Sequence, residues 1–353
     1  MELGLGKKQG VKKSGTVTLR AVAQHVGLTP GTVSSVLNDA PAAKAIPQHT
    51  KNRIFAAAHE LNYRPNFFAR SLRKKRTYTI GVIAEEIGDA YGSMVISGIE
   101  AHLREKNYFF LTVVHRHDPQ LLEQYSSMLL ARGVEGIITV DTSLKQTPAL
   151  PTVAVAGHHK AKGVTNIVLD HKRAAALALQ HLVELGHRQI AFIRGQAISS
   201  DSAERWEAIL EVAEEMKLPI RMELTAQLTG NDPSPEAGYQ VTRELISRRH
   251  CFTALFAYND ISAIGAVRAI REAGLRVPQD ISVMGFDDIR EAGYQTPSLT
   301  TVRQPLRKMG EIAAQTLRER IEGRKDYPAV IAVEPELVVR ESTSVAMLHP
   351  GWC

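Results

Sequence analysis

From Thr79 to about residue 287 the sequence alternates short apolar runs with segments of helical periodicity. The apolar runs read TIGVIA, FFLTVV, EGIITV, TVAVA, QIAFI, MELTAQL, TALFA and ISVMGF. Helical segments fall near 93–106, 119–132, 202–217, 235–248 and 260–273, and another runs through LALQHLVELG. Strands that alternate with helices favour parallel sheets, because a parallel pair needs a long crossover between its strands. We therefore expect an α/β fold with two doubly wound parallel sheets, one in each of two subdomains.

The segment after residue 300 predicts how the two subdomains are connected. It contains one long helix near 305–322 and two short strands before Arg340, so it can cross between the subdomains and complete both. The predicted parts are an N-terminal subdomain (about 77–170 and 303–328), a C-terminal subdomain (about 171–300 and 329–345) and a tail (346–353).

The first 76 residues predict a separate helical unit, with a flexible basic tail at 1–15 and a folded part at 16–64. The stretch TLRAVAQHVG gives one short amphipathic helix that ends at Gly27. The stretch LTPGTVSSVLN gives a second, with Thr29 as its cap and Pro30 as its first residue. Two such helices joined by a short turn match the helix-turn-helix pattern, and QHTKNRIFAAAHELNY supplies a third helix.

Positive charge is concentrated in this N-terminal part. Of the 43 Lys and Arg residues, 14 lie in residues 1–76, together with only three of the 37 Asp and Glu residues. The first part therefore carries a net charge of +11 and the remainder −5. A solvated basic tail would explain Lys7, Lys8, Lys12 and Lys13, but the charge continues into a segment predicted to fold. A polyanion partner for this part alone is the better explanation.

Polar residues follow the predicted strands of the body. In the first sheet they are Glu85 and Glu86 with Tyr91 close behind, then His115, Arg116 and His117, then Asp141. In the second sheet they are Arg194, with Arg205 and Trp206 on the next helix, then Asn259, Asp260, Asp287 and Asp288. Ligands of doubly wound sheets bind beyond the carboxyl ends of the strands. Carboxylates, an amide, guanidinium groups and aromatic faces together suit a hydroxyl-rich small molecule such as a sugar.

Plainer explanations exist for several of these residues. Asp260 and Asp288 could cap helices, and Trp206 could pack in the core. The pairs His115/His117 and His158/His159 are not joined by a matching set of Cys, His or carboxylate ligands, so no metal site is expected. No P-loop, G-x-S-x-G or H-E-x-x-H motif is present, and neither a cofactor nor enzymatic activity is expected.

The sequence also favours a cytoplasmic protein. The N-terminal stretch MELGLGKKQGVKKSG has no apolar core of a signal peptide, and no run approaches the roughly 18 apolar residues of a membrane span. We expect no membrane contact.

Six stretches, taken in order, resemble signatures of the LacI/GalR (lactose-repressor) family of bacterial transcription regulators. They read TLRAVAQHVGLTPGTVSSVLN, LNYRPNFFARSL, IGVIAEE, LVELGHRQIAFI, YNDISAIGAVRAI and VPQDISVMGFDDI with TPSLTTVRQP. The resemblance covers about Val17 to Arg340. It implies a homodimer with an N-terminal helix-turn-helix, a hinge helix at 65–76, and a body like a periplasmic sugar-binding protein. The partners implied are double-stranded DNA with a pseudo-palindromic operator and a small effector, expected to be a saccharide.

The resemblance assigns DNA contacts to the head and the hinge. In the hinge, Leu72 matches the leucine that wedges between base pairs in the minor groove, and Arg73 follows it. Phe68 and Ala69 match positions between paired hinges, and Arg70 lies near phosphates. The remaining implied positions are Thr18, Thr29, Pro30, Gly31, Thr32, Ser34, Ser35, Asn38 and Asn66. Pro30 and Gly31 have no side-chain donors, so direct base readout should be thin and DNA bending should add selectivity.

For the effector, Arg116, Arg205, Asn259 and Asp287 match the family's recurrent ligand-contacting residues. Glu85 and Glu86 stand in place of the usual Asp/Pro pattern, and Ala208 and Ile209 in place of the usual Gly-aromatic pair. Tyr91 and Trp206 complete the predicted effector site. The expected function is a repressor that a small ligand regulates allosterically; the alternatives are a solute-binding protein without a DNA role, or an enzyme. The C-terminal stretch SVAMLHPGWC lacks leucine heptads, so we expect a dimer rather than a tetramer.

Overall fold

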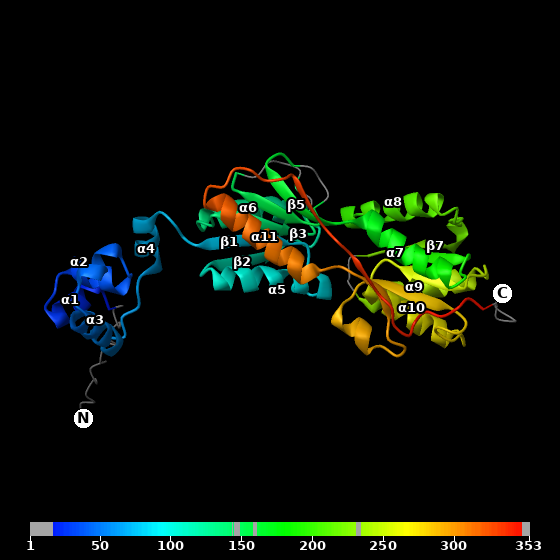
Figure 1. The fold of residues 1–353 in the computed structure, drawn as a ribbon, viewed down its shortest axis with the longest axis horizontal. Coiled ribbons are helices and arrows are strands. Elements are labelled where there is room, and N and C mark those ends of the chain that lie inside the picture. Colours follow the sequence, from blue (N-terminus) through cyan, green and yellow to red (C-terminus); the bar gives the residue numbers. More distant parts are fainter. Residues whose placement is uncertain (1–16, 143, 145–148, 158–160, 231–233, 348–353) are drawn as a thin grey trace, which may run out of the picture. The chain divides into compact units, whose positions relative to one another are not determined.

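The computed structural model describes residues 17–142, 144, 149–157, 161–230 and 234–347. The predicted tail at 1–15, most of that at 346–353, and the pair His158/His159 lie outside the described residues. The chain divides into two compact units, Met1–Arg76 and Thr77–Cys353, called here the head and the body (Figure 1). In the part of the chain that the structure describes, no helix is long and apolar enough to cross a membrane.

The head is built on three helices, α1 (Leu19–Val26), α2 (Pro30–Leu37) and α3 (Gln48–Glu60), as predicted. Val22, Val33 and Ile54, one from each helix, are completely buried and form the centre of its core. The turn between α1 and α2 forms because Gly27 adopts a left-handed conformation with φ 68°, which glycine reaches without a steric penalty.

The long connection between α2 and α3 contains a short 3₁₀ helix, Pro41–Ala45, whose Ala43 packs into the same core. This connection is therefore part of the packed head.

The hinge segment contains the helix α4 (Phe67–Lys74). Asn66 begins it by accepting a hydrogen bond from the backbone N–H of Ala69 at 3.1 Å, and Lys75 ends it with φ 52°. A helix of eight residues is marginal in water without a partner surface.

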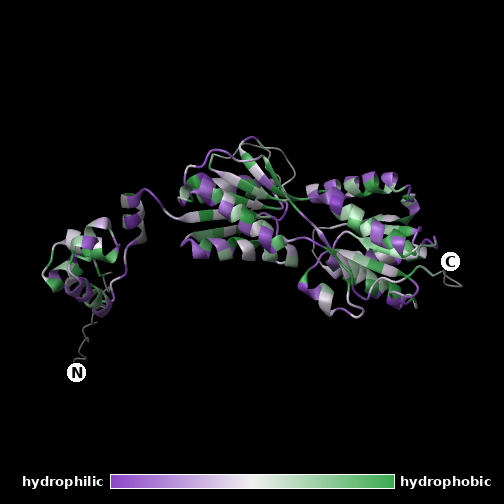
Figure 2. Cartoon of the chain, in the orientation of Figure 1, coloured by the Kyte–Doolittle hydropathy of each residue, from purple (hydrophilic) through white to green (hydrophobic). Residues whose placement is uncertain are grey.

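In the first sheet of the body all strands are parallel, in the order β11-β5-β4-β3-β1-β2. The strands are β1 (Thr79–Ala84), β2 (Phe109–Val114), β3 (Gly136–Val140), β4 (Thr152–Val155), β5 (Val164–Leu169) and β11 (Val330–Val333). Helices α5 (Ala90–Glu105), α6 (Pro119–Ala131) and α11 (Leu306–Ile321) cover it. Hydrophobic and hydrophilic residues alternate along such helices, as one buried face requires (Figure 2).

The second sheet has the order β12-β10-β9-β8-β6-β7. Its strands are β6 (Ile190–Arg194), β7 (Thr225–Gln227), β8 (Ala254–Ala257), β9 (Ser282–Asp287), β10 (Thr300–Arg303) and β12 (Glu336–Val338). Helices α7 (His171–Glu184), α8 (Ser200–Glu215), α9 (Pro235–Ser247) and α10 (Asp260–Glu272) pack in the same half. The α/β class with two largely parallel sheets is therefore confirmed.

Two details of the prediction were wrong. Strand β11 pairs with β5, so Val330–Val333 belongs to the first half of the body and not to the second. Strand β12 runs antiparallel to β10, so the second sheet is not wholly parallel. The direction of β12 follows from the path of the chain, because the chain leaves the first sheet at the carboxyl end of β11. The chain then enters the second sheet from the carboxyl end of that sheet, and must run opposite to its other strands.

Helices α5 and α11 approach each other unusually closely. An added Cβ at Gly98 would lie 1.9 Å from the carbonyl oxygen of Arg307, and one at Gly310 would lie 2.0 Å from that of Val95. Only glycine at these two positions allows the two backbones to meet. The contact joins the last long helix of the chain to the first long helix of the body.

Replacing Gly98 by alanine should lower the free energy of unfolding of the body by about 1–3 kcal/mol, because backbone cannot move aside as a side chain can. Urea unfolding followed by circular dichroism would measure the change. Gly293→Ala is the matched control, since no atom lies within 4 Å of its Cβ position. Equal stability of the two variants would contradict this account of the α5–α11 contact.

Candidate DNA-binding and ligand-binding sites

The amino-terminal end of α2 presents polar backbone and small side chains to solvent. Thr29, Pro30 and Gly31 are exposed, while Thr32 and Ser35 are half-buried. Thr29 caps the helix by accepting a hydrogen bond from the N–H of Thr32 at 3.2 Å, and the two hydroxyls lie 2.9 Å apart. Thr18 is exposed and caps α1 in the same way, through the N–H of Ala21. Since capping occupies these side chains, backbone and shape dominate this surface.

Ser34 and Asn38 differ from the other predicted DNA contacts. Ser34 is only 9% exposed, and the side-chain amide of Asn38 donates to its carbonyl oxygen at 2.8 Å. The pair closes the carboxyl end of α2. Ser34 therefore supports the helix from inside, and Asn38 remains half-exposed beside it.

The hinge helix exposes an apolar side chain among cations. Leu72 is 82% exposed, and Asn66, Ala69 and Arg70 are also exposed. Arg73 lies on the same helix, but its side chain and that of Phe68 lie outside the described part of the structure. A leucine so exposed on a short capped helix needs a partner that removes it from water.

In the body, the predicted ligand-binding residues gather at the carboxyl ends of the strands of both sheets. The residues that follow β2 and β3 adopt left-handed conformations, with φ 48° at Arg116, 61° at His117 and 47° at Asp141. Asp287, the last residue of β9, has φ 108°. Such conformations are unfavourable for residues other than glycine and often mark functional sites.

The region where these strand ends of the two halves of the body meet is called here the cleft. Several contacts hold Arg205 in it. It is 4% exposed, and its guanidinium donates to Asp201 Oδ2 at 2.5 Å and to the carbonyl oxygen of Tyr258. Its Cζ atom also lies 3.7 Å from the centre of the Phe286 ring and 4.5 Å from that of Tyr258. These contacts join α8 to the ends of β8 and β9. The remaining guanidinium nitrogen, Nε, is buried without an acceptor.

Carboxyl groups dominate the rest of the cleft. Burial and then the charges of Asp89, Glu86 and Asp201 raise the pKa of Glu85 to about 8. Burial raises the pKa of Asp287 to about 7, although Arg205 and a 2.6 Å hydrogen bond from Gln304 oppose the rise. The pKa of Asp141 is raised well above its ordinary value by burial and by Glu85, Asp201 and Asp89.

Each half of the cleft also brings a histidine to a carboxylate. His117 Nε2 lies 2.7 Å from Glu85 Oε1, and His171 Nε2 lies 3.2 Å from Asp201 Oδ1. Burial lowers the pKa of His117, which leaves the proton of the first pair on Glu85 at neutral pH. In the described residues no group of three His, Cys, Asp or Glu could hold a metal ion.

Other predicted ligand-binding residues have structural partners. Asn259 caps α10 by accepting from the N–H of Ser262 at 2.9 Å. Glu86 accepts from the backbone N–H groups of Ile87 and Gly88, which lowers its pKa and shapes the loop after β1. These contacts leave Glu86 and Asn259 less free to hold a ligand.

Arg116 and Trp206 lie at the margin of the cleft. The side chain of Arg116 is 78% exposed and lies 3.9 Å from Glu86. Trp206 packs edge-on against Phe192, with the guanidinium of Arg194 4.9 Å from its ring centre.

The expectation that Asp260 and Asp288 cap helices was wrong, since Asn259 caps α10 and no side chain caps the 3₁₀ helix Arg290–Tyr294, but both residues have structural partners. Asp260 is buried and accepts from the Thr301 hydroxyl and from the N–H of Ile289. Asp288 accepts from Arg303 and Arg340.

Sequence reasoning missed Asp89, Asp201, Tyr258 and His171 as residues of the cleft. Asp201 precedes Arg205 by four residues, the spacing that places two side chains on one face of a helix, so it could have been found. Tyr258 follows β8 directly, and the rule that located Asn259 also reaches it. Asp89 and His171 lie beyond the carboxyl ends of β1 and β5, where the same rule needed a longer reach along the chain.

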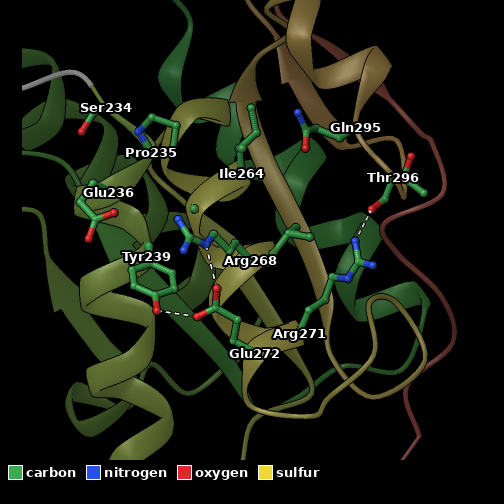
Figure 3. Close-up of a pocket in the computed structure, with 12 residues that line it drawn as sticks. Ser234, Pro235, Glu236, Tyr239, Ile264, Arg268, Arg271, Glu272, Gln295 and Thr296 are labelled. Carbon is green, nitrogen blue, oxygen red and sulfur yellow. Dashed lines mark hydrogen bonds and ion pairs between the residues drawn. The ribbon is translucent and has the colours of Figure 1, made fainter.

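Another hollow of the body is lined by none of these cleft residues (Figure 3). It has a volume of about 780 Å³ and lies over α9, α10 and the loop at 295–296. Glu272 accepts there from Tyr239 at 2.5 Å and from Arg268 at 2.8 Å, and Arg271 donates to the carbonyl oxygen of Thr296. None of the predicted effector residues lines it. A much smaller space, of about 10 Å³, lies beside Arg205 and Trp206 and is lined by residues of the second half of the body alone.

The body should lose stability as the pH rises above neutrality. Because the pKa of Glu85 is higher in the folded state, its contribution is complete below 4.5 and is lost as the pH rises through about 8. Glu85→Gln should reduce this loss by an amount on the order of 2 kcal/mol. Thermal unfolding between about pH 6 and 8.5 would measure it. Glu214→Gln, which removes an exposed carboxylate from α8, is the control, and an unchanged slope in Glu85→Gln would contradict the assignment.

Known proteins resemble both the head and the body of this chain. The family model described as bacterial regulatory proteins, lacI family, matches residues 18–66, and the periplasmic binding protein-like domain matches 179–343. The HTH-type transcriptional repressor PurR of Yersinia pestis bv. Antiqua (strain Antiqua) is 33% identical over 336 residues, which are 93% of this chain and 97% of that protein.

Solved structures agree with these matches. The lac repressor dimer bound to operator and the anti-inducer ONPF has a TM-score of 0.83 at 27% identity, covering 93% of this chain and 99% of that one. The complex of the transcriptional regulator CelR with cellobiose has a TM-score of 0.68 at 27% identity, covering 92% and 99%. A LacI family regulator from Enterococcus faecium with bound ribose has a TM-score of 0.67 at 27% identity, covering 76% and 100%. The chain belongs to the lacI family of bacterial regulatory proteins and is a DNA-binding transcriptional repressor with a periplasmic-binding-protein-like ligand domain.

Proposed function

We propose that the protein acts as a homodimer on a pseudo-palindromic operator. The helix-turn-helix part of the head (residues 16–64) lies in the major groove, and the hinge segment of the head (65–76) lies in the minor groove. The observation that carries this proposal is Leu72, which is 82% exposed on a capped helix with Arg70 beside it. Inserted into a base step, this leucine leaves water while the flanking cations meet phosphates. The lac repressor dimer bound to operator is a relative of the whole chain.

Direct readout of bases by α2 is limited. Pro30 and Gly31 have no side-chain donors, and the hydroxyls of Thr29 and Thr32 face each other. Ser35 and Asn38 are the half-exposed polar side chains left for base edges. Selectivity therefore depends strongly on the energy needed to bend the operator at its centre.

The effector binds at the carboxyl ends of the two sheets of the body, in the effector-binding and dimerisation domain formed by residues 77–345. Arg205, Asp287 and Glu85 are the residues we assign to it first, with Tyr91 above them and Trp206, Asn259, Glu86 and Arg116 at the margin. Relatives in complexes with cellobiose and ribose support a small, hydroxyl-rich ligand. Binding without turnover, in the cytoplasm, is the proposed role, since the cleft is tied to a DNA-binding head.

Ligand and operator are coupled through the closure of this cleft. A ligand that holds the two halves of the body together changes how the two hinges of a dimer present themselves to DNA. The coupling is reciprocal, so a ligand that weakens operator binding must bind less tightly to the operator complex. A protein that bound the ligand but had no preferred DNA site would instead be a solute-binding protein.

Leu72→Ala should weaken specific operator binding by about 10–100-fold, since burying a leucine contributes about 1.5–3 kcal/mol. Non-specific binding should change little, because cations sustain it. Fluorescence anisotropy with operator and scrambled duplexes would measure both. Leu210→Ala, which removes a leucine 40% exposed on α8, is the matched control. Equal losses on both duplexes would contradict the wedge role.

Arg70→Ala should lower the slope of log affinity against log salt by about 2 for a dimer, since each phosphate contact contributes roughly 0.9. Operator titrations at several salt concentrations would measure the slope. Arg173→Ala, an exposed arginine of the body, should leave it unchanged. A slope that responds equally to both substitutions would place the phosphate contacts elsewhere.

A further inference from the structure

The cleft of the body contains far more negative than positive side chains. Glu85, Asp89, Asp141, Asp201 and Asp287 all meet there, contributed by the ends of β1, β3 and β9 and by α5 and α8. The cation buried among them is Arg205. If all were ionised, five negative charges would face this guanidinium, with His117 and His171 beside two of them.

These carboxyl groups are close enough to affect one another across the two halves of the body. Glu85 and Asp141 belong to the first half and Asp201 to the second. The charge of Asp201 contributes to the raised pKa of both Glu85 and Asp141. Asp89 contributes to the raised pKa of Glu85, Asp141 and Asp287. The five groups therefore form one electrostatic unit, called here the carboxyl cluster.

The fold itself uses only part of the carboxyl cluster. Asp201 pairs with Arg205, Asp89 caps α5 through the N–H of Gly92 at 2.8 Å, and Asp287 accepts from Gln304. Among the described residues no side-chain hydrogen bond of Asp141 is found, although the residue is half-buried at the end of β3. The fold therefore offers Asp141 no donor to offset the loss of hydration that raises its pKa, which leaves this carboxyl group available to a ligand.

Two buried hydrogen-bond donors of the same cleft also lack an acceptor. The hydroxyl oxygen of Tyr91 is fully buried and has no hydrogen-bond partner, and the same is true of Nε of Arg205. After burial, the charges of Asp201, Asp141 and Asp287 raise the pKa of Tyr91, so its hydroxyl lies within reach of both halves of the cluster. Buried donors of this kind are normally paired, which points to a ligand that supplies acceptors.

The charge of the cluster restricts what that ligand can be. A phosphorylated or carboxylated ligand would add negative charge to a site that already repels it. A neutral sugar could accept from Tyr91 and Arg205, but it would leave the carboxyl groups protonated or repelling one another. An ammonium group supplies three donors and a positive charge, and so matches carboxylates from both halves of the body.

We propose that the effector carries a protonated amine together with hydroxyl groups, as amino sugars and amino alcohols do. The amine binds among Asp141, Glu85 and Asp201, and the hydroxyl oxygens accept from Tyr91 and Arg205. This assignment rests on the proposed function, because it names the ligand class of the same cleft.

The test compares amines with analogues that have a hydroxyl in place of the amine. Full-length protein at neutral pH is titrated calorimetrically with glucosamine and glucose, galactosamine and galactose, and 1-amino-2,3-propanediol and glycerol. The N-acetylated and phosphorylated forms of the two amino sugars are tested beside them. At least one free amine should bind ten times or more tightly than its hydroxyl analogue and raise the midpoint of thermal unfolding. The proposal is overturned if no amine exceeds its analogue, or if a neutral or phosphorylated form binds best.

Asp141→Asn tests the position of the amine. It keeps the size of the side chain and removes its charge, so the ratio of amine to hydroxyl-analogue affinity should fall tenfold or more. Glu214→Gln, which removes an exposed carboxylate from α8, should leave that ratio unchanged. Calorimetry in two buffers of different ionisation enthalpy adds a second readout, because the amine should release protons from the cluster on binding. An unchanged ratio and no proton release in the unsubstituted protein would place the amine elsewhere and overturn the assignment.

Failure of this inference and failure of the proposed function give different results. Operator affinity is measured separately, with and without the tightest-binding probe. Specific operator binding without any preference for amines would reject the ligand class and leave the repressor function standing. Preference for amines without a preferred DNA site would support the ligand class and reject the repressor function.

Discussion

The buried guanidinium of Arg205 organises the cleft on which regulation depends. It joins Asp201 on α8 to the carbonyl of Tyr258 after β8, and it lies flat against Phe286 in β9. Removing one partner of such a buried pair leaves an uncompensated charge, which costs about 3–5 kcal/mol. The pair therefore fixes the geometry of the second half of the cleft before any ligand arrives. The first half has no comparable cation among its described residues, and its carboxyl groups face this one.

The two ends of the protein share a design in which local structure is left incomplete. Helix α4 is capped by Asn66 but is too short to be stable alone, and it exposes Leu72. In the cleft, the buried hydroxyl of Tyr91 has no partner, and the carboxyl group of Asp141 has no hydrogen bond among the described residues. Each end gains what it lacks from a different molecule, DNA in one case and the effector in the other. In the proposed function these two gains are coupled, so binding of the effector changes the free energy available for binding DNA.

Most of the fold could be predicted from the sequence because it depends on short-range patterns. The cap Thr29, the first-turn residue Pro30, the apolar runs of the strands and the periodicity of α11 all act within a few residues. The direction of β12 could not be predicted, since it depends on the two sheets presenting their carboxyl ends to each other. The residues of the cleft divide in the same way, into those that short-range patterns predict and those that depend on distant parts of the chain. Arg205 and Asp287 could be located from strand ends, whereas the hydrogen bond from Arg205 to the carbonyl oxygen of Tyr258 and the capping role of Asn259 required side-chain geometry.

The excess of carboxyl groups gives the cleft a physical reason to open and close. Without a cation between them, Glu85 and Asp141 in one half and Asp201 in the other cannot all ionise without repelling one another, and burial together with this repulsion raises the pKa of Glu85 and of Asp141. A ligand with a positive charge makes their ionisation favourable, so its attraction to carboxylates of both halves contributes directly to closure. A neutral ligand would have to supply the same free energy through hydrogen bonds alone. A ligand shifts such an equilibrium only by its differential affinity for the two states, and charge placed between the halves contributes mainly to the closed one.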